Sequence, residues 1–539
     1  MKDISSTGSF INFYLNNYIY VDKTQYIRDL IKLERVFISR PRRFGKSLTL
    51  DTIATLFETG VEPYFKGTWI YDKWTEPTYP VLRLNFLDLD KYSLEHFKQK
   101  LNAIISSFAR DINVKNYEEK VEPEDTIYFL LDELRKEKRQ IVILIDEYDC
   151  QMTANINNET LYKQFQEKIK SFYATIKNKW PIKFLGITGV TRLKDVEIFS
   201  IGSDIKDITN YSPYSQMIGF SRDEIKKYYI DYLKLAASCE NNCSVDKVTE
   251  AQIESLLDRL AKNYDGYCFD EDYEKKVFST WSVNTFLQSV VDKKKVQFGE
   301  YWYDNGGVPK ILSDFVKNNE QELFDCILKG KFISVPTSDL KFPPSLISIN
   351  PKVLMCQTGY LTLCSNLKYF EMLLGVPNSE IYKALSRLLA NNIFKGNTDI
   401  TDDYGRSLLE VGTVDDIINL FNSALNSVSY DNYPIVSESS VQNMLKLYLL
   451  GAHQKVLSEV HEAKGRADLV VNTDNRRIVF EFKYAKNETE AKSKLLDAVE
   501  QIKTRDYGNI VPKKTELLRI AAVFNADPKV RAFTEYQEV

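Results

Sequence analysis

The sequence predicts a multidomain α/β protein, and three observations carry this expectation. First, 539 residues exceed what one hydrophobic core organises, so about two to four domains are expected. Second, short apolar runs alternate with helical patterns as far as about residue 220, which is typical of a parallel sheet covered by helices. Third, strand-like runs return after a mostly helical stretch. We expect domains at residues 1–220, 221–395 and 405–539.

The first domain is predicted from four apolar runs. Residues 36–39 form a short run, followed by a turn and by helical spacing of apolar residues over 47–58. Further buried strands are expected at 80–86, 141–145 and 183–189. The first of these segments therefore has the order strand, loop, helix.

The rest of the chain is predicted to contain a helical lid, a small mixed α/β segment and a second α/β core. Helical patterns at 222–235 and 251–260 dominate the middle, with aromatic clusters between them. In the last domain we expect strands at 456–460, 467–471, 477–482 and 517–524, and a helix at 488–502.

Composition excludes several classes of protein. With 71 Lys and Arg against 75 Asp and Glu, the net charge of -4 gives no global signature of nucleic-acid binding, so any such surface is local. Seven cysteines without a CxxC pair indicate reduced thiols, and three histidines argue against a histidine-rich zinc site. No apolar stretch reaches about 18 residues, so no membrane partner is expected. We predict an intracellular, cytoplasmic protein, or a nuclear one if it is eukaryotic.

The first candidate site is the loop at residues 40–47, Arg-Pro-Arg-Arg-Phe-Gly-Lys-Ser. Its end fits the Walker A pattern G-x-x-x-x-G-K-[ST], in which backbone N–H groups, a lysine and a hydroxyl hold phosphates and Mg²⁺. Arg40 replaces the first glycine. We expect this P-loop to bind ATP; the alternative is a basic turn before a helix. The expected nucleotide-binding residues are Arg42, Arg43, Phe44, Gly45, Lys46 and Ser47.

A second half of the same site is expected where residues 141–145 end in two acids, in the manner of a Walker B strand. Asp146 is predicted to hold Mg²⁺ together with Ser47, and Glu147 to orient or deprotonate the attacking water. Thr188, after the next strand, is expected to sense the γ-phosphate. Arg192 is a candidate for stabilising transferred charge, although a surface arginine is an equal alternative.

The second candidate site lies near the C-terminus. Asp468 falls on one expected strand, and Glu481 and Lys483 on the next. Because side chains alternate along a strand, Glu481 and Lys483 share one face, and the phenylalanines beside them point to the other. Two acids and a lysine on adjacent strands can hold Mg²⁺ and hydrolyse a phosphodiester, with Asp468 and Glu481 as ligands. The alternative is an exposed cross-strand salt bridge.

These motifs, taken in order, resemble a known family. The segments resemble the AAA-ATPase-like domain that is found joined to a PD-(D/E)XK nuclease domain, and they lie at residues 20–24, 40–48, 145–149, 186–192, 264–267, 358–362 and 376–381. In that family the arginine-rich loop is usual, so Arg40 is not a defect. The resemblance covers nearly the whole chain.

The resemblance also implies further residues of a restriction-endonuclease-like core. Asp468, Glu481 and Lys483 match its metal-binding Asp and E-x-K pair, and Glu438 matches the acid on its first core helix. Gln501, with Tyr507 beyond it, matches the second core helix. Ala467 replaces the family's proline. Because no core position is lost, an active nuclease is expected, and local Lys and Arg residues suit a phosphate backbone.

Together these features predict an ATP-binding and ATP-hydrolysing protein coupled to a Mg²⁺-dependent nuclease that acts on DNA or RNA. A homo-oligomer is compatible with this reading. Two alternatives stay open. In one, the nucleotide switches a nuclease fold that binds nucleic acid without cleaving it. In the other, the chain is a sensor or defence protein that binds a protein partner.

Overall fold

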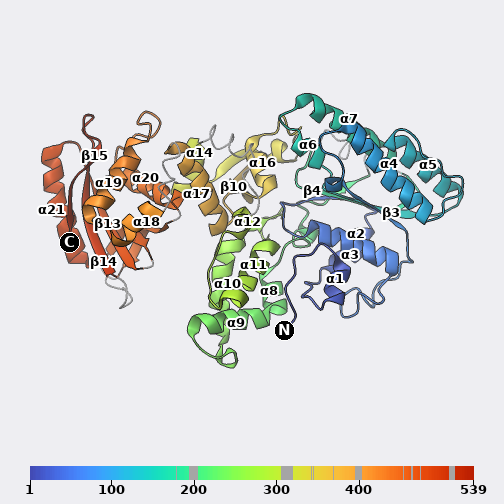
Figure 1. Ribbon diagram of the computed structural model, residues 1–539, viewed down its shortest axis with the longest axis horizontal. Helices are drawn as coiled ribbons and strands as arrows, with labels where there is room; N and C mark the ends of the chain where they lie inside the picture. Colours follow the sequence, from blue (N-terminus) through green and yellow to red (C-terminus); the bar gives the residue numbers. More distant parts are fainter. Residues whose placement is uncertain are drawn as a thin grey trace. The chain divides into compact units, whose positions relative to one another are not determined.

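The computed structural model describes residues 1–177, 179–193, 204–304, 320–341, 343, 345–367, 370–394, 403–452, 454–462, 465–473, 475–508 and 516–539 (Figure 1). It divides into two compact units, each described separately below. The first unit comprises Met1–Gly307 and Phe332–Ile381, and the second comprises Val308–Lys331 and Tyr382–Val539.

A five-stranded parallel sheet is the centre of the first unit. Its strands are β1 (Arg35–Ser39), β2 (Val81–Asn85), β3 (Ile141–Asp146), β4 (Ile182–Gly189) and β5 (Lys206–Asp207), in the order β2-β3-β4-β1-β5. Both β1 and β3 pair with β4 in parallel, with Phe37 and Ile145 each opposite Ile187. The carboxyl ends of β1, β3 and β4 therefore lie side by side, and chemistry at this edge draws on all three.

Helices cover both faces of this sheet, as the continuous burial of its strands requires. Figure 1 shows one group on one side and a second group on the other. The first group is α4 (Leu94–Asp111), α5 (Pro123–Lys136) and α7 (Glu159–Ile176), with short α6 (Cys150–Ala154) near them; the second is α1 (Phe10–Leu15), α2 (Thr24–Ile31) and α3 (Lys46–Thr59). Helix α5 begins at a proline and ends in basic residues, as capping and helix-dipole effects favour.

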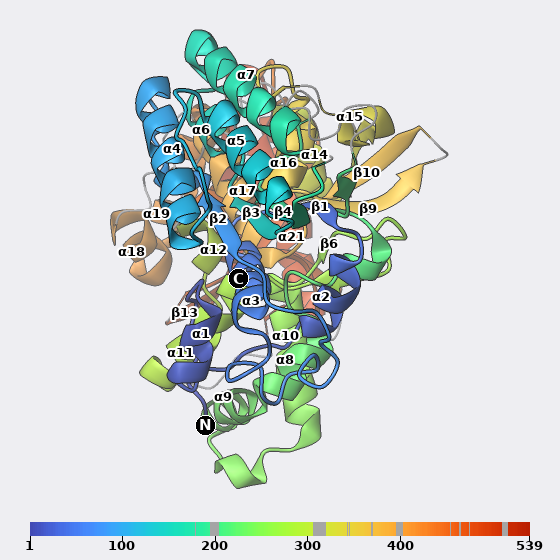
Figure 2. The same ribbon diagram turned by 90° about the vertical axis from the view of Figure 1, so that its right-hand side faces the viewer.

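A helical bundle follows the sheet in the first unit (Figure 2). It contains α8 (Arg222–Tyr228), α9 (Ile230–Asn241), α10 (Glu250–Tyr264), α11 (Thr280–Lys293) and short α12 (Tyr301–Asp304). Leu233, Leu257 and Phe286 are fully buried in its core. One continuous helix was expected over 222–235, but the chain breaks at Tyr229, whose buried hydroxyl donates to Asn284 Oδ1 (2.7 Å).

Short strands complete the first unit. β6 (Tyr267–Cys268) pairs with β7 (Lys276–Val277), and β8 (Ile333–Pro336), β9 (Thr362–Leu367) and β10 (Glu371–Gly375) form an antiparallel sheet in the order β8-β10-β9. Helices α15 (Thr337–Lys341) and α16 (Pro351–Thr358) lie between these strands in sequence. A helical lid and a mixed segment are thus present in this part of the chain.

The second unit is built on a mixed five-stranded sheet. Its strands are β11 (Lys455–Glu462), β12 (Gly465–Asn472), β13 (Arg476–Ala485), β14 (Glu516–Asn525) and β15 (Ala532–Glu538), in sequence order across the sheet. Only β13 and β14 pair in parallel, and α21 (Glu488–Arg505) makes the crossover between them. The other helices are α14 (Glu320–Lys329), α17 (Ser379–Ile393), α18 (Asp403–Val411), α19 (Val414–Asn426) and α20 (Glu438–Gly451); α17 begins in the first unit.

The α/β class, the parallel N-terminal sheet and the C-terminal α/β core are therefore confirmed. The division into domains at 220 and near 400 stays a prediction, and residues 395–402 lie outside the described part. Within the described ranges, no helix combines the length and the apolar character needed to cross a membrane.

The end of β4 is fixed by one buried carboxylate. Asp149 accepts hydrogen bonds from Val190 N (3.3 Å), Thr191 N (2.6 Å) and the Thr191 hydroxyl, and is 1% exposed. The Tyr148 hydroxyl adds a bond to Thr191 O (3.1 Å). Gly189 lies against both side chains, so the turn after β3 and the end of β4 form one locked structure.

We predict that Gly189→Ala destabilises the first unit. A Cβ at Gly189 would lie 2.7 Å from Tyr148 Cε1 and 2.8 Å from Asp149 Oδ1, and both side chains are already held in place. Overpacking of this kind costs about 1–3 kcal/mol, which thermal unfolding would record as a Tm lowered by several degrees. Gly8→Ala is the matched control, because the nearest atom to its Cβ is 3.8 Å away. Equal Tm values for the two variants would contradict the packing argument.

We also predict that a fragment of residues 382–539 melts at a higher temperature than a fragment of residues 405–539. Both contain the C-terminal sheet, but only the longer one keeps Phe394, whose buried ring packs on Tyr448 at 5.2 Å. Removing such a ring costs about 3–5 kcal/mol. Circular dichroism melts of the two fragments test this, and identical melts would show that the C-terminal part of α17 is dispensable to the second unit.

Candidate functional sites

The loop between β1 and α3 folds around the ammonium group of Lys46. Lys46 Nζ donates to the carbonyl oxygens of Arg40 (3.1 Å) and Pro41 (3.2 Å), and the side chain is 4% exposed. Arg43 and Gly45 have φ values of 68° and 106°, which close the loop tightly before α3 begins. Glycine is the residue type that adopts this conformation without strain.

Three polar groups from three elements meet beside this loop. Ser47 Oγ, in the first turn of α3, donates to Asp146 Oδ2 (2.5 Å) at the end of β3. The Thr188 hydroxyl at the end of β4 donates to Asp146 Oδ1. The sheet order explains the meeting, because β4 lies between β1 and β3. The structure thus brings Ser47, Asp146 and Thr188 together.

Glu147 faces the same lysine. Its Oε1 lies 3.5 Å from Lys46 Nζ, and burial raises the pKa of its carboxyl above the ordinary value. The residue has a φ of 52°, an uncommon conformation for a residue with a side chain, and such conformations cluster at functional sites. Lys46 and Glu147 are therefore mutual partners across the mouth of the loop.

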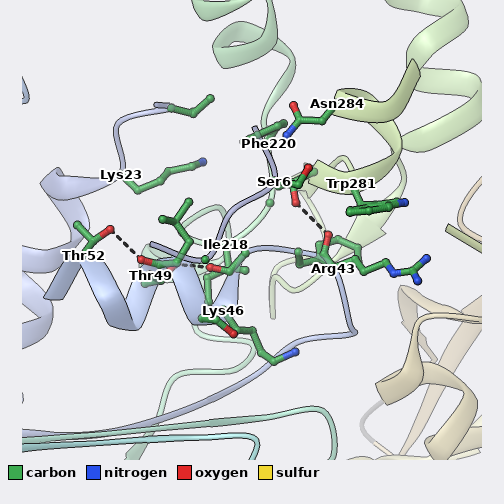
Figure 3. A pocket seen from close by; sticks show the side chains of 18 of the residues that line it. Ser6, Lys23, Arg43, Lys46, Thr49, Thr52, Ile218, Phe220, Trp281 and Asn284 are labelled. Atoms are coloured by element: carbon green, nitrogen blue, oxygen red, sulfur yellow. Dashed lines mark hydrogen bonds between the residues drawn. The ribbon is translucent and has the colours of Figure 1, made fainter. Parts of the chain in front are cut away.

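A cavity of about 380 Å³ opens beside the loop (Figure 3). One wall is the loop and the start of α3, including Lys46 and Thr49. The facing wall comes from segments outside the predicted motifs: residues 5–8, residues 217–220, and the start of α11 with Trp281 and Asn284. The cavity is therefore lined by the loop and the start of α3 on one side, and by both polar and apolar groups on the other.

Lys23 also lines this cavity and is tied to the helical bundle. Its Nζ donates to Glu224 Oε2 (2.6 Å) and to Gln216 O (2.7 Å). Glu224 also accepts from Ser221 N (2.8 Å) in the capping box that begins α8. Lys23 belongs to the family-like segment at residues 20–24, but the sequence did not predict that it pairs with Glu224.

Residues 42–44 of the loop make further contacts with downstream segments of the first unit. Arg43 Nη1 donates to Trp302 O (2.8 Å), and its guanidinium stacks on Trp281 at 5.0 Å. Arg42 is exposed and lines the cavity, and its carbonyl accepts from the Trp302 indole (3.1 Å). Phe44 is buried against Tyr267 with ring centroids 4.8 Å apart. Arg43 and Phe44 thus attach the loop to downstream segments of the first unit.

Arg40 and Arg192 lie on the far side of the loop. Arg40 is 1% exposed, donates to Thr209 O (2.6 Å) and Ser39 O (2.9 Å), and burial lowers its pKa to about 9. Arg192 forms an ion pair with Asp207 on β5 and donates to Leu340 O (3.4 Å). Neither arginine lines the 380 Å³ cavity.

In the second unit, carboxylates from three elements converge. Glu438 at the start of α20, Asp468 on β12 and Glu481 on β13 each offer an oxygen, and these atoms lie within 4.8 Å of one another. The backbone N–H of Phe482 donates to Asp468 Oδ2 (2.8 Å), which fixes that carboxylate. The three predicted acids are thus brought together.

Lys483 completes the cluster. Its Nζ lies 2.7 Å from Glu481 Oε1 and 3.4 Å from Glu438 Oε1. Phe480 and Phe482 stack with centroids 5.5 Å apart and are fully buried, as expected for side chains that alternate with Glu481 and Lys483. One ammonium thus lies beside two of the three carboxylates.

This donor set fits a divalent cation. Glu481 is 1% exposed, and within the described part of the chain its Oε2 is buried and accepts no hydrogen bond. Burial raises the pKa of Glu481 to about 7 and that of Asp468 to about 6. A buried carboxylate oxygen without a donor is costly, and a hard cation is the partner that oxygen ligands of this kind bind. A simple surface salt bridge would leave no such buried oxygen.

Gln501 and Tyr507 are linked by a hydrogen bond. On α21, Gln501 Nε2 donates to the hydroxyl of Tyr507 (3.3 Å), which is fully buried and donates to Arg466 O (2.8 Å). The predicted pair of Gln501 and Tyr507 is therefore present as a contact.

Most basic groups near this site are neutralised within the unit. Lys492 and Lys494 pair with Glu488 and Glu490 on their own helix, at 2.7 and 2.8 Å. Arg466 pairs with Glu459. These two lysines of α21 are thus compensated by acids of their own helix.

Comparison with known proteins agrees with this geometry. Residues 5–199 match the family model of predicted AAA-ATPases, and residues 436–533 match that of the PD-(D/E)XK nuclease superfamily. An uncharacterized protein in the vnfD 5′ region of Azotobacter chroococcum mcd 1 is 25% identical over 533 residues, covering 95% of this chain and 94% of that protein.

Solved structures give weak likenesses. Cdc6p of Pyrobaculum aerophilum is 12% identical with a TM-score of 0.22, covering 68% of this chain and 93% of its own. The ORC1 protein of Aeropyrum pernix in complex with DNA is 10% identical with a TM-score of 0.28, covering 73% and 100%. The first family match contains the loop between β1 and α3, and the second contains the carboxylate cluster, so the two matches agree with the domain architecture that the sequence motifs resemble.

Proposed function

We propose that this protein binds and hydrolyses ATP in its first unit and cleaves a nucleic-acid phosphodiester in its second unit with the help of Mg²⁺. The observation that carries the nuclease half is the meeting of Glu438, Asp468 and Glu481 beside Lys483. The nucleotide-regulated nuclease is the simplest function that uses both sites.

In the nucleotide site, each side chain has a task that follows from its position. Lys46 is placed to bind the β- and γ-phosphates, and Ser47 and Asp146 to hold Mg²⁺ beside them. Glu147, with its raised pKa, is suited to accept a proton from the attacking water. Thr188 bonds to Asp146 and can report whether the γ-phosphate is present.

The cavity is also suited to the rest of a nucleotide. The apolar side chains of Ile218, Phe220 and Trp281 line it and offer surfaces for a flat base (Figure 3). The volume of about 380 Å³ falls within the range of small-molecule sites. Thr188 and Arg192 do not line it, so we assign Arg192 no contact with the nucleotide in this arrangement.

In the second unit, the acids would hold the cation and Lys483 would orient the attacking water. When bound, Mg²⁺ supplies positive charge that activates water and stabilises the phosphate in the transition state. The attacking water loses a proton as its oxygen bonds to phosphorus, the bond from phosphorus to the leaving sugar oxygen breaks, and that oxygen takes up a proton. Lys483, 2.7 Å from Glu481, is placed to steer the nucleophile.

Coupling between the sites is supported by contacts of the loop. The Arg42 carbonyl and the Arg43 side chain both bond to Trp302, and Trp302 N donates to Glu380 Oε1 (2.6 Å). Glu380 lies in the first turn of α17, and this helix continues into the second unit. Nucleotide-dependent movement of the loop would thus reach a helix shared by both units.

We predict that Lys46→Ala weakens ATP binding by about 10- to 150-fold, because charged hydrogen bonds contribute about 1.5–3 kcal/mol each. Glu147→Gln should keep ATP binding and lower hydrolysis by about 10²–10⁴-fold, since it removes only the proton acceptor. Titration calorimetry and phosphate release measure the two effects. Lys163→Ala, on the surface of α7, is the matched control. Parent-like ATP binding by Lys46→Ala would reject the assignment of the loop.

We further predict that Asp468→Ala, Glu481→Ala and Lys483→Ala each lower Mg²⁺-dependent cleavage by at least about 100-fold. The two acid variants should lose cation binding in calorimetric titration, whereas Lys483→Ala should keep it. Asp497→Ala, an exposed acid on α21, is the control. The Tm of each variant separates chemistry from folding.

The outcomes of these assays separate the alternatives. ATP turnover with nucleic-acid binding but no cleavage would favour a nucleotide switch with a non-cleaving nuclease fold. Binding of ATP with neither turnover nor nucleic-acid binding would favour a sensor that acts on a protein partner. A panel of single- and double-stranded DNA and RNA, each with Mg²⁺ and ATP, covers both cases.

A further inference from the structure

We infer that Arg505 is the phosphate-binding residue of the C-terminal site, and this inference rests on the nuclease function proposed above. Arg505 is the last residue of α21, the helix that crosses from β13 to β14. Neither the motifs nor the family resemblance assigns it a role.

The side chain of Arg505 crosses the start of β12. A Cβ at Gly465, three residues before Asp468, would lie 2.6 Å from Arg505 Cδ and 3.3 Å from its Cγ. Only the absence of a side chain at Gly465 leaves room for this path. The guanidinium is thereby carried toward the strand that bears Asp468.

The guanidinium is held from one side only. Arg505 Nη1 donates to the hydroxyl of Tyr507 (2.9 Å). That buried hydroxyl donates to Arg466 O and also accepts a hydrogen bond from Gln501 Nε2. Within the described ranges Arg505 makes no ion pair, in contrast to Lys492, Lys494 and Arg466. Its Nε and Nη2 stay available for a ligand.

The guanidinium of Arg505 lies within electrostatic range of the acids of the cluster. Glu481 and Asp468 both stabilise its positive form electrostatically, after the hydrogen bond to Tyr507. A cluster of three carboxylates repels a phosphodiester, so the approach of this substrate needs a fixed cation beside them. Arginine suits the task, because its planar fork can bind two phosphate oxygens together.

The test uses the full chain and compares Arg505→Ala, Arg505→Lys and the control Lys492→Ala, whose lysine is exposed and paired on the same helix. We expect Arg505→Ala to lower kcat/KM for Mg²⁺-dependent cleavage of an oligonucleotide by about 100-fold. Arg505→Lys should recover part of this, since a lysine keeps the charge but loses the fork. All three should share the parent Tm.

A binding measurement makes the inference independent of cleavage. With Ca²⁺ replacing Mg²⁺, fluorescence anisotropy of a labelled single-stranded oligonucleotide gives Kd at several salt concentrations. The slope of log Kd against log[salt] should be smaller by about 0.7 in Arg505→Ala, which is the value of one lost phosphate contact. A purely structural role of Arg505 would leave this slope unchanged.

Gly465→Ala gives a second variant that keeps the guanidinium but blocks its path. It should reproduce the loss of affinity seen with Arg505→Ala. Parent-like salt dependence and affinity in Arg505→Ala would overturn the inference. If the parent protein cleaves no oligonucleotide but Arg505→Ala still weakens oligonucleotide binding, the proposed nuclease function is refuted and Arg505 is supported as a phosphate contact.

Discussion

A buried charge has to be matched by partners, and both candidate sites of this chain are organised by that requirement. Lys46 is 4% exposed and meets two carbonyl oxygens and the carboxylate of Glu147. Glu481 is 1% exposed and meets Lys483 on one oxygen only. In the proposed sites, a phosphate would bind Lys46 and a cation would bind Glu481, and the protein's own groups take these places here.

The scaffold explains why these charges lie where they do. In the first unit, parallel pairing of β1, β4 and β3 brings three strand ends to one edge of the sheet. Asp146 ends β3, Thr188 lies near the end of β4, and Ser47 lies in the first turn of the helix that follows β1. In the second unit, antiparallel pairing of β12 with β13 places Asp468 beside Glu481, and α20 adds Glu438. Hydrophobic burial of the strands fixes the register, and the register fixes the site.

Much of this could be predicted from the sequence, and the physical reason is the strength of the local patterns. Five consecutive apolar residues at 141–145 predicted β3, and alternation around Glu481 placed the charged and aromatic side chains on opposite faces. The two-residue strand β5 and the break at Tyr229 escaped prediction, because pairing with β1 and a hydroxyl bond to Asn284 are long-range contacts. Local sequence also could not show that Arg43 would fold back onto Trp281. Nor could it show that residues 5–8 and 217–220 wall the cavity.

The hydrogen bonds and the ion pair of Lys46 affect the apparent affinity of the proposed site for nucleotide. A phosphate that takes this ammonium has to compete with Glu147 and with the carbonyl groups of Arg40 and Pro41, which are attached to the same chain and never diffuse away. Such tethered competitors lower apparent affinity without removing any contact to the incoming molecule. In the proposed nucleotide site, Glu147 would therefore raise the nucleotide concentration that half-fills the site, in addition to its proposed role as the base.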